Sequence, residues 1–182
     1  MPVDDKKLKK VVKEGGKRGV EIEGAATMGG LEFFCTKVDE PEGDVELLIE
    51  SVKAMNAPCD DAEEERKGGA GDIGKMIFST NDERVAIVAH VPESKKDKID
   101  AKEWLQSVVG HYDGKVLSGD NLLASGEILA NPDKGIFTLK VRDEALTKGI
   151  EYLRSKGCFP EANDDDSDDD VVFGDDFDFD NA

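Results

Sequence analysis

One basic side chain of this sequence lies in a loop suited to meet an anion. Residues 111–121 read HYDGKVLSGDN, so Lys115 stands between Gly114 and Gly119 among turn-forming residues. Glycine lets a backbone approach a ligand closely, and a lysine ammonium meets a phosphate as a point charge. This loop is the best candidate in the sequence for a phosphate-binding surface, and the other interpretation is a plain surface turn with solvated polar residues.

A second group of basic side chains stands near the N-terminus. Residues 1–20 carry seven basic side chains against three acidic ones. Clustered lysine and arginine neutralise phosphate charge without reading base sequence. The residues expected to contact nucleic acid are Lys6, Lys7, Lys9 and Lys10, continued by Lys13, Lys17 and Arg18, with Arg142 as a further phosphate contact within the fold.

Residue types that carry enzymatic or metal chemistry are sparse. The chain has two histidines, His90 and His111, and neither has a cysteine or a second histidine at metal-ligand spacing. No GxxxxGK[ST] phosphate loop occurs, and the glycine-rich segment 69–74 precedes a predicted strand, whereas a dinucleotide fingerprint must follow one. The three widely spaced cysteines are expected to be free thiols. The sequence therefore predicts no enzymatic activity, no metal and no cofactor.

The C-terminus is strongly acidic. Residues 161–182 hold eleven of the 42 acidic side chains and no basic one, while residues 73–160 are neutral overall. Such a segment cannot bury enough apolar surface to fold alone, so we expect a disordered acidic tail. Ser167, followed by three aspartates, fits an acidophilic kinase. The side chains that could dock into the groove of a basic partner protein are Phe173, Phe177 and Phe179.

Composition and charge exclude several classes of protein. The formal net charge of -18 excludes a large, uniformly basic nucleic-acid face but is compatible with a local basic patch. No apolar run approaches the roughly 20 residues needed to cross a bilayer. The N-terminus has neither a signal-type apolar stretch nor a transit-type composition. We expect a cytoplasmic protein, with a nuclear location as the alternative and no membrane association.

The elements that must position these side chains begin with a strand and a helix. Residues 31–38 are rich in strand formers, and Asp44 then caps a helix whose apolar residues recur at helical spacing over 45–55. Residues 75–79 and 84–89 are two strand-like runs joined by a short polar turn, which predicts a hairpin.

The second half repeats this alternation. A helix begins after Asp100, whose spacing to Glu103 is typical of a capping box. Residues 114–126 are interpreted as a loop, residues 128–140 as a second hairpin, and residues 144–153 as a last amphipathic helix. Strands grouped in hairpins between helices favour an α+β fold, with an antiparallel or mixed sheet and amphipathic helices packed on it.

The first residues are expected to lie outside that fold. The segment from Lys6 to Glu14 is predicted to be a short basic helix or a frayed arm that stops at the glycine pair Gly15-Gly16. Residues 20–23 alternate as a short strand would. The sequence therefore divides into a basic N-terminal arm at 1–28, an α+β domain at 29–160 and an acidic tail at 161–182.

Residues 100–109, DAKEWLQSVV, followed by Asp113-Gly114-Lys115, resemble the C-terminal domain of eukaryotic alanyl-tRNA synthetases. The order of the predicted elements over 29–156 is similar to that domain as well. The resemblance implies a free-standing module that contacts the outer corner of tRNA, can form a homodimer and performs no chemistry. Gly114 and Lys115 match the family's motif directly, and Gly119 matches it more loosely.

Two hypotheses about function follow. The first is a non-enzymatic accessory module in translation that associates with tRNA or another RNA, with phosphate contacts from Lys115, Arg142 and the N-terminal lysines. The second is a protein interaction adaptor, in which the acidic tail with its aromatic residues recruits a basic partner protein.

Overall fold

The computed structural model describes residues 5–57 and 68–158. Nine main elements and three single 3-10 turns follow one another in this part of the chain. The main elements are α1 (Asp5–Gly29), β1 (Phe33–Lys37), α2 (Val45–Asn56), β2 (Gly74–Thr80), β3 (Arg84–His90), α3 (Ala101–Val109), β4 (Lys115–Gly119), β5 (Leu123–Leu129) and α4 (Thr138–Ser155). None of the helices described here is both long and apolar enough to span a bilayer.

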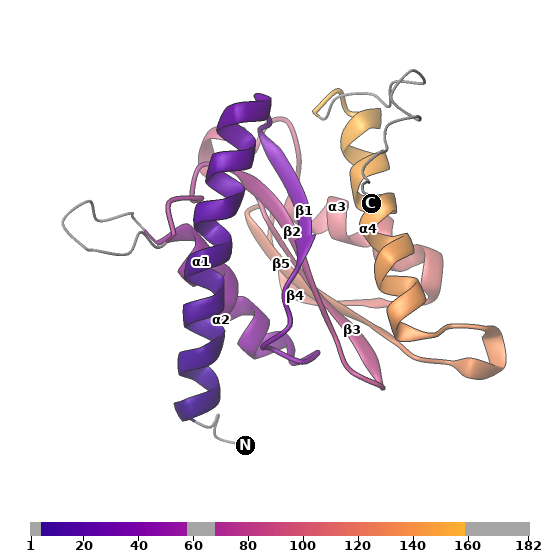
Figure 1. Cartoon of the computed structure of the whole chain (residues 1–182). Helices are drawn as coiled ribbons and strands as arrows, with labels where there is room; N and C mark the ends of the chain where they lie inside the picture. The colour runs from indigo at the N-terminus through magenta and orange to yellow at the C-terminus, as the bar shows by residue number, and fades with distance from the viewer. Residues whose placement is uncertain (1–4, 58–67, 159–182) are drawn as a thin grey trace, which may run out of the picture.

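These elements form three layers around one sheet (Figure 1). The sheet has five strands in the order β1-β2-β3-β5-β4. β1 runs parallel to β2, with α2 as the crossover between them, and the other neighbouring strands are antiparallel. One face of the sheet is covered by α1 and α2, and the other by α3 and α4. The predicted α+β class is confirmed, and the sheet is of the mixed type.

The two helices with predicted caps begin where the sequence places them. Asp44 accepts a hydrogen bond from the backbone N–H of Leu47 (3.1 Å) at the start of α2. Asp100 accepts from the backbone N–H groups of Lys102 (2.9 Å) and Glu103 (3.1 Å) at the start of α3. These carboxylates satisfy donors that have no partner within their own helix, so each cap fixes the first turn.

Trp104 of α3 is the centre of the core on the α3/α4 face. Its fully buried ring meets Phe33 of β1 edge to face, with the ring centroids 5.9 Å apart. Its indole Nε1–H donates to the backbone carbonyl of Gly149 in α4, 3.1 Å away. One side chain thus joins α3, α4 and the edge of the sheet.

The N-terminal region differs from the prediction. The helix α1 runs for 25 residues through Gly15-Gly16, so the predicted stop at this pair and the predicted strand at 20–23 are wrong. A Cβ atom on Gly15 would lie 2.4 Å from the backbone oxygen of Ser51, and one on Gly19 would lie 2.8 Å from that of Met55. Glycine is required here because α1 and α2 are in backbone contact. Residues 5–28, expected to be an arm, belong to a helix packed along α2.

The second half of the chain differs as well. The predicted loop at 114–126 is instead the antiparallel pair β4–β5, whose turn is closed by the Asp120 carboxylate accepting from the backbone N–H groups of Leu122 and Leu123. The predicted hairpin at 128–140 is wrong, because β5 ends at Leu129 and α4 begins at Thr138. The last helix was therefore predicted too short. It is held by a row of buried residues, namely Val141, Ala145, Gly149 and Leu153.

Candidate functional site

The outer face of α1 carries a row of lysines. The opposite face is buried, and Val11, Gly15 and Ile22 lie on it. With 3.6 residues per turn, residues at i, i+4, i+7 and i+11 lie on one side of a helix. The exposed residues at and beside these positions are Lys6, Lys9, Lys10, Lys13 and Lys17, which we call the lysine stripe. The stripe faces solvent because the packing of α1 on α2 fixes the rotation of the helix.

Two neighbouring basic side chains on α1 are held by acidic partners instead. Lys7 forms an ion pair with Glu42, and Arg18 Nη1 lies 2.7 Å from Glu21 Oε1. Among the described residues, no ion pair involves Lys10, Lys13 or Lys17.

Glu14, an acidic residue beside the stripe, is itself engaged. Glu14 accepts hydrogen bonds from the backbone N–H groups of Asp39 and Glu40, both at 3.0 Å. These bonds fasten α1 to the loop that precedes α2. A shallow depression of about 330 Å³ lies on this side of α1, and it is lined by Lys10, Lys13, Glu14, Lys17, Arg18, Glu21 and Glu40.

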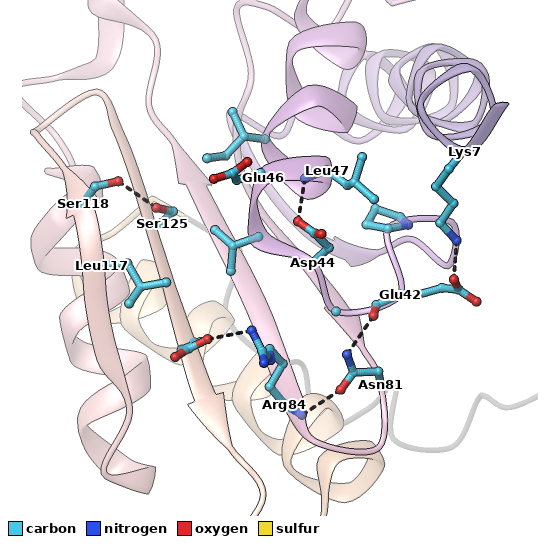
Figure 2. A pocket seen from close by; sticks show the side chains of 15 residues that line it. Lys7, Glu42, Asp44, Glu46, Leu47, Asn81, Arg84, Leu117, Ser118 and Ser125 are labelled. Carbon is cyan, nitrogen blue, oxygen red and sulfur yellow. Dashed lines mark hydrogen bonds and ion pairs between the residues drawn. The ribbon is translucent and has the colours of Figure 1, made fainter. Parts of the chain in front are cut away.

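A groove of about 780 Å³ lies between the N-terminal end of α2 and the uncovered part of the sheet. Figure 2 shows Asp44 and Leu47 on the α2 side and Leu117 on the opposite side. Ser118 of β4 and Ser125 of β5 form a hydroxyl pair at 2.9 Å on that side. α2 covers the sheet over β2 and β3 but leaves β4 open, with Leu117 47% exposed.

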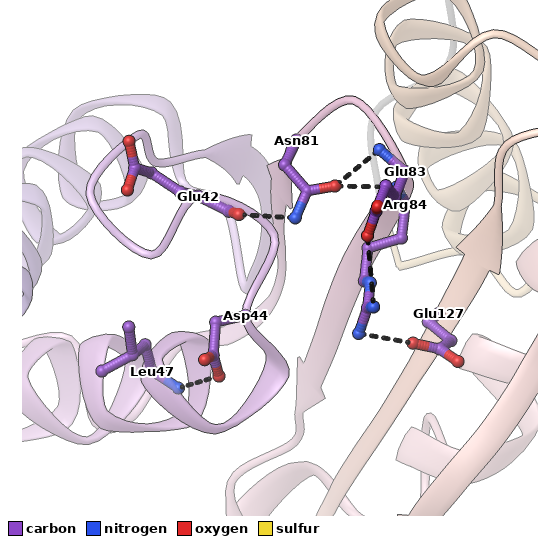
Figure 3. Close-up of polar contacts among 7 residues, drawn as sticks. All are labelled: Glu42, Asp44, Leu47, Asn81, Glu83, Arg84 and Glu127. Atoms are coloured by element: carbon purple, nitrogen blue, oxygen red, sulfur yellow. Dashed lines mark hydrogen bonds and ion pairs between the residues drawn. The ribbon is translucent and has the colours of Figure 1, made fainter. Parts of the chain in front are cut away.

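Asn81 organises the end of this groove (Figure 3). Its amide nitrogen donates to the backbone oxygen of Glu42 (3.0 Å). Its side-chain oxygen accepts from the backbone N–H groups of Glu83 (2.7 Å) and Arg84 (2.9 Å). The loop before α2 is thereby tied to the β2–β3 turn, and the groove has fixed walls.

The charges in the groove do not favour an anionic ligand. Its two basic side chains are both in ion pairs: Lys7 with Glu42, and Arg84 with Glu127 at 3.5 Å. The remaining carboxylates that line it are Asp44 and Glu46. With four carboxylates against two cations, a phosphate group meets net negative charge here.

The predicted phosphate loop is the edge of the sheet. Lys115 is the first residue of β4, exposed and paired in register with Glu127 of β5. It lines a cavity of about 260 Å³, in which Lys134 and Asp113 form an ion pair at 3.2 Å. Lys115 therefore stands among acidic and basic side chains of about equal number.

The two glycines flanking Lys115 have structural roles. A Cβ on Gly114 would lie 2.8 Å from the backbone oxygen of Glu127 in β5. Gly119 adopts a φ of +135°, and a Cβ there would lie 2.3 Å from the Cα of Ala124. Both positions are needed to form the β4 strand, whatever ligand the edge binds.

The other predicted contacts do not join the lysine stripe. Arg142 lies on α4, which covers the opposite face of the sheet from α1, and its guanidinium bonds to Asp143 at 3.0 and 3.2 Å. The predictions for Ser167, Phe173, Phe177 and Phe179 lie outside the described residues. Of the predicted nucleic-acid contacts, the structure brings together those on α1.

A buried lysine is the feature that sequence reasoning missed. The Nζ atom of Lys75 in β2, fully buried, donates to Asn56 Oδ1 (2.5 Å), Ala70 O (2.8 Å) and Ile73 O (2.7 Å). It lies 3.3 Å from His90 Nδ1. The only signal in the sequence is a lysine at the start of an otherwise apolar strand.

Burial shifts the titration of this cluster. It lowers the pKa of Lys75 to about 7, and the nearby Asp72 carboxylate opposes the shift. Burial, followed by the charge of Lys75, lowers the pKa of His90 to about 4. The histidine is therefore neutral near pH 7, and its unprotonated nitrogen can accept from the amine. The cluster fastens segment 70–73 and the end of α2 to the sheet.

Neither a metal site nor a disulfide occurs in the described part of the chain. No group of three or more histidine, cysteine or acidic side chains there could hold a metal ion. Cys35 and Cys158 are free thiols, as predicted, and Cys59 lies outside the described residues. Burial raises the pKa of the Cys35 thiol far above its usual range, so this cysteine is not an activated nucleophile.

No known protein family matches the sequence, and no curated protein matches it. Among solved structures, the C-Ala domain of Aquifex aeolicus alanyl-tRNA synthetase is 22% identical, over 63% of this chain and 90% of that one, with a TM-score of 0.38. The catalytic domain of the histidine kinase ThkA is 18% identical, over 70% of this chain and 95% of that one, with a TM-score of 0.22. The first is of the synthetase domain type that the sequence resembles. At these TM-scores, neither similarity assigns a function to this chain.

Proposed function

We propose that this protein is a non-catalytic, RNA-associated module that holds the phosphate backbone of RNA along the lysine stripe of α1. The observation that carries the proposal is the fixed rotation of α1. Because its glycine face is in backbone contact with α2, the ammonium groups stay together on the solvent side. Preorganised charges bind a polyanion at a lower entropic cost than lysines on a flexible arm.

The dimensions of the stripe suit a nucleic acid strand. Lys6 and Lys17 are eleven residues apart, which is about 16 Å along a helix axis. That length spans several consecutive phosphates of one strand. Lysine contacts phosphate as a point charge and does not read base edges, so binding should depend on salt and little on sequence.

The alternative anion sites are less suited. The groove beside α2 is lined by more carboxylates than cations, and Lys115 faces Glu127 across the β4–β5 pair.

The test is RNA binding by a variant that removes the centre of the stripe. The variant is Lys10→Gln, Lys13→Gln and Lys17→Gln together. Its matched control is Lys102→Gln, Lys140→Gln and Lys148→Gln on the α3/α4 face, which removes the same charge. Fluorescently labelled tRNA is the first probe, because residues 100–115 resemble a tRNA-contacting domain. Binding is followed by anisotropy from about 50 to about 200 mM salt.

Each lysine that neutralises a phosphate adds about 0.7 to 0.9 to the slope of log affinity against log salt. The stripe variant should therefore reduce this slope by about 2 to 3, whereas the control should leave it unchanged. The proposal is wrong if tRNA is bound at the lowest salt neither by the wild-type chain nor by a variant in which the aspartates of 164–170 are neutral. It is equally wrong if the stripe variant keeps the wild-type slope.

A further inference from the structure

We infer that the acidic segment 161–182 of this same chain lies along the lysine stripe of α1 and competes there with RNA. The competition with RNA rests on the proposed function, whereas the contact between segment 161–182 and the stripe can be measured without RNA. The inference concerns how the stripe is regulated, and it assigns an occupant to the stripe when no nucleic acid is present.

The described chain ends beside the end of α1. A cavity of about 570 Å³ is lined both by Gly30, Leu31 and Glu32, which follow α1, and by Lys156, Gly157 and Cys158, which follow α4. In Figure 1, α1 and α4 both end at the top of the view. A segment that continues from Cys158 therefore starts close to the C-terminal end of α1, although the two helices cover opposite faces of the sheet.

The lengths agree. Lys17 is twelve residues before Gly29, or about 18 Å down α1 from its C-terminal end. Asp164 is six residues beyond Cys158, so an extended chain reaches it after about 20 Å. The run from Asp164 to Asp170 then extends for about another 20 Å, against about 16 Å between Lys17 and Lys6. The densest acids can thus face the stripe one after another.

Charge favours the lysine stripe over the other described surfaces as the place where the acidic run binds. The run contains six aspartates with Ser167 among them, and a row of cations suits it. Within the stripe, Lys10, Lys13 and Lys17 form no ion pair among the described residues, and the neighbouring Glu14 and Glu21 are engaged with backbone N–H groups and with Arg18. The groove beside α2 repels it, because four carboxylates line that groove. Many of the remaining basic side chains already form ion pairs, among them Lys7, Arg18, Lys53, Arg84, Lys96, Lys98, Lys134, Arg142 and Lys148.

Carbodiimide crosslinking of the full chain tests the contact itself. This reagent joins a lysine amine to a carboxylate only where the two touch, and mass spectrometry identifies the pair. We expect crosslinks from Lys10, Lys13 and Lys17 to the acids of 164–170 at low salt, and their loss as salt rises. Mixing isotope-labelled with unlabelled chains distinguishes crosslinks within one chain from those between chains. Crosslinks only between chains, or none from the stripe to this run, would overturn the inference.

A full-length variant with neutral residues in the run tests the competition. Its six aspartates become asparagine, namely Asp164, Asp165, Asp166, Asp168, Asp169 and Asp170. We expect this variant to bind tRNA about tenfold or more tightly than wild type at about 50 mM salt, with the gain shrinking toward about 200 mM. The control converts Asp82, Asp97 and Asp133, which are exposed elsewhere in the fold, to asparagine and should give a much smaller gain.

The outcomes separate the two proposals. If the crosslinks form within one chain but neither wild type nor the neutral variant binds tRNA, the tail contact stands and the proposed function fails. If tRNA binds through the stripe, no crosslinks form, and the wild type and the neutral variant bind with equal affinity, the proposed function stands. The inference about segment 161–182 is then overturned.

Discussion

The ammonium of Lys75 lies 2.5 Å from the side-chain oxygen of Asn56, which joins the start of β2 to the C-terminal end of α2. The C-terminal end of a helix carries a partial negative charge, so it is a favourable place for a cation. Two backbone carbonyls complete the set of acceptors around the amine. The buried lysine thus has hydrogen-bond partners that offset part of the cost of removing it from water.

The stability of the fold should rise with pH above neutrality because of Lys75. Burial lowers the pKa of this residue to about 7, whereas the unfolded chain has a lysine pKa of about 10.4. Between these values the unfolded state binds more protons, so the free energy of unfolding increases with pH by up to about 1.4 kcal/mol per unit. We expect the urea midpoint to move upward from about pH 7 to about pH 8, measured by circular dichroism.

The control for that measurement is Lys75→Met, which should flatten the profile. The measurement stops near pH 8 because of the Cys35 thiol. Above that pH this thiol ionises in the unfolded chain, whereas burial raises its pKa in the folded protein. The contribution of the thiol to the free energy of unfolding then falls with rising pH, which opposes the effect of Lys75. If Lys75→Met does not fold, the wild-type profile alone decides, and a flat or falling midpoint would contradict the expectation.

Adding one methyl group to the buried face of α1 should separate it from α2. A Cβ on Gly15 would stand 2.4 Å from Ser51 O, so Gly15→Ala forces the two backbones apart. We expect a loss of about 1 to 3 kcal/mol, in spite of the higher helix propensity of alanine. Gly24→Ala, where nothing lies within 4 Å, is the control and should gain up to about 1 kcal/mol. Equal effects of the two substitutions in thermal unfolding would refute the close packing.

The hydrogen bond from Trp104 to Gly149 should matter to stability. Trp104→Phe removes the donor of the 3.1 Å bond, leaves a buried carbonyl without it and opens space beside Phe33. Together these effects should cost about 2 to 4 kcal/mol. Leu139→Ala, at a side chain that is 62% exposed, should change the unfolding free energy by less than about 0.5 kcal/mol. A tryptophan variant as stable as the leucine variant would show that α3 and α4 are held by other contacts.

The two described cysteines should react with iodoacetamide in a fixed order. Burial raises the pKa of both thiols, but Cys35 is buried beneath α4, whereas Cys158 is partly exposed. Since the thiolate is the reactive form, Cys158 should be alkylated in the native protein well before Cys35. Mass spectrometry of native and urea-unfolded samples gives both rates. Comparable rates for the two residues in the native state would mean that the α4 face opens readily.

Local signals explain which elements could be predicted from the sequence. α2 and α3 begin at Asp44 and Asp100 because a cap acts within one helical turn and needs no distant partner. The β2–β3 hairpin was also visible, because its two strands are apolar and adjacent in the chain. These elements would look the same in almost any fold.

The elements that were predicted wrongly depend on contacts between distant parts of the chain. Gly15-Gly16 was interpreted as a stop because glycine is a poor helix former, yet Ser51, far along the chain, makes glycine necessary there. β4 was interpreted as a loop because Ser118 and Gly119 lack strand propensity, and the pairing with β5 overrides it. For the candidate site, the lysines could be named from the sequence, but their alignment depends on that same unforeseen helix.

The five glycines of α1 have one more consequence. Each weakens a free helix by about 1 kcal/mol relative to alanine, so a peptide of residues 5–29 in water would remain mostly unwound. Its charges would be those of the protein, but they would be scattered over many conformations. The ordered row of ammonium groups is therefore a property of tertiary assembly, and it disappears when the domain melts, even though every lysine is still present.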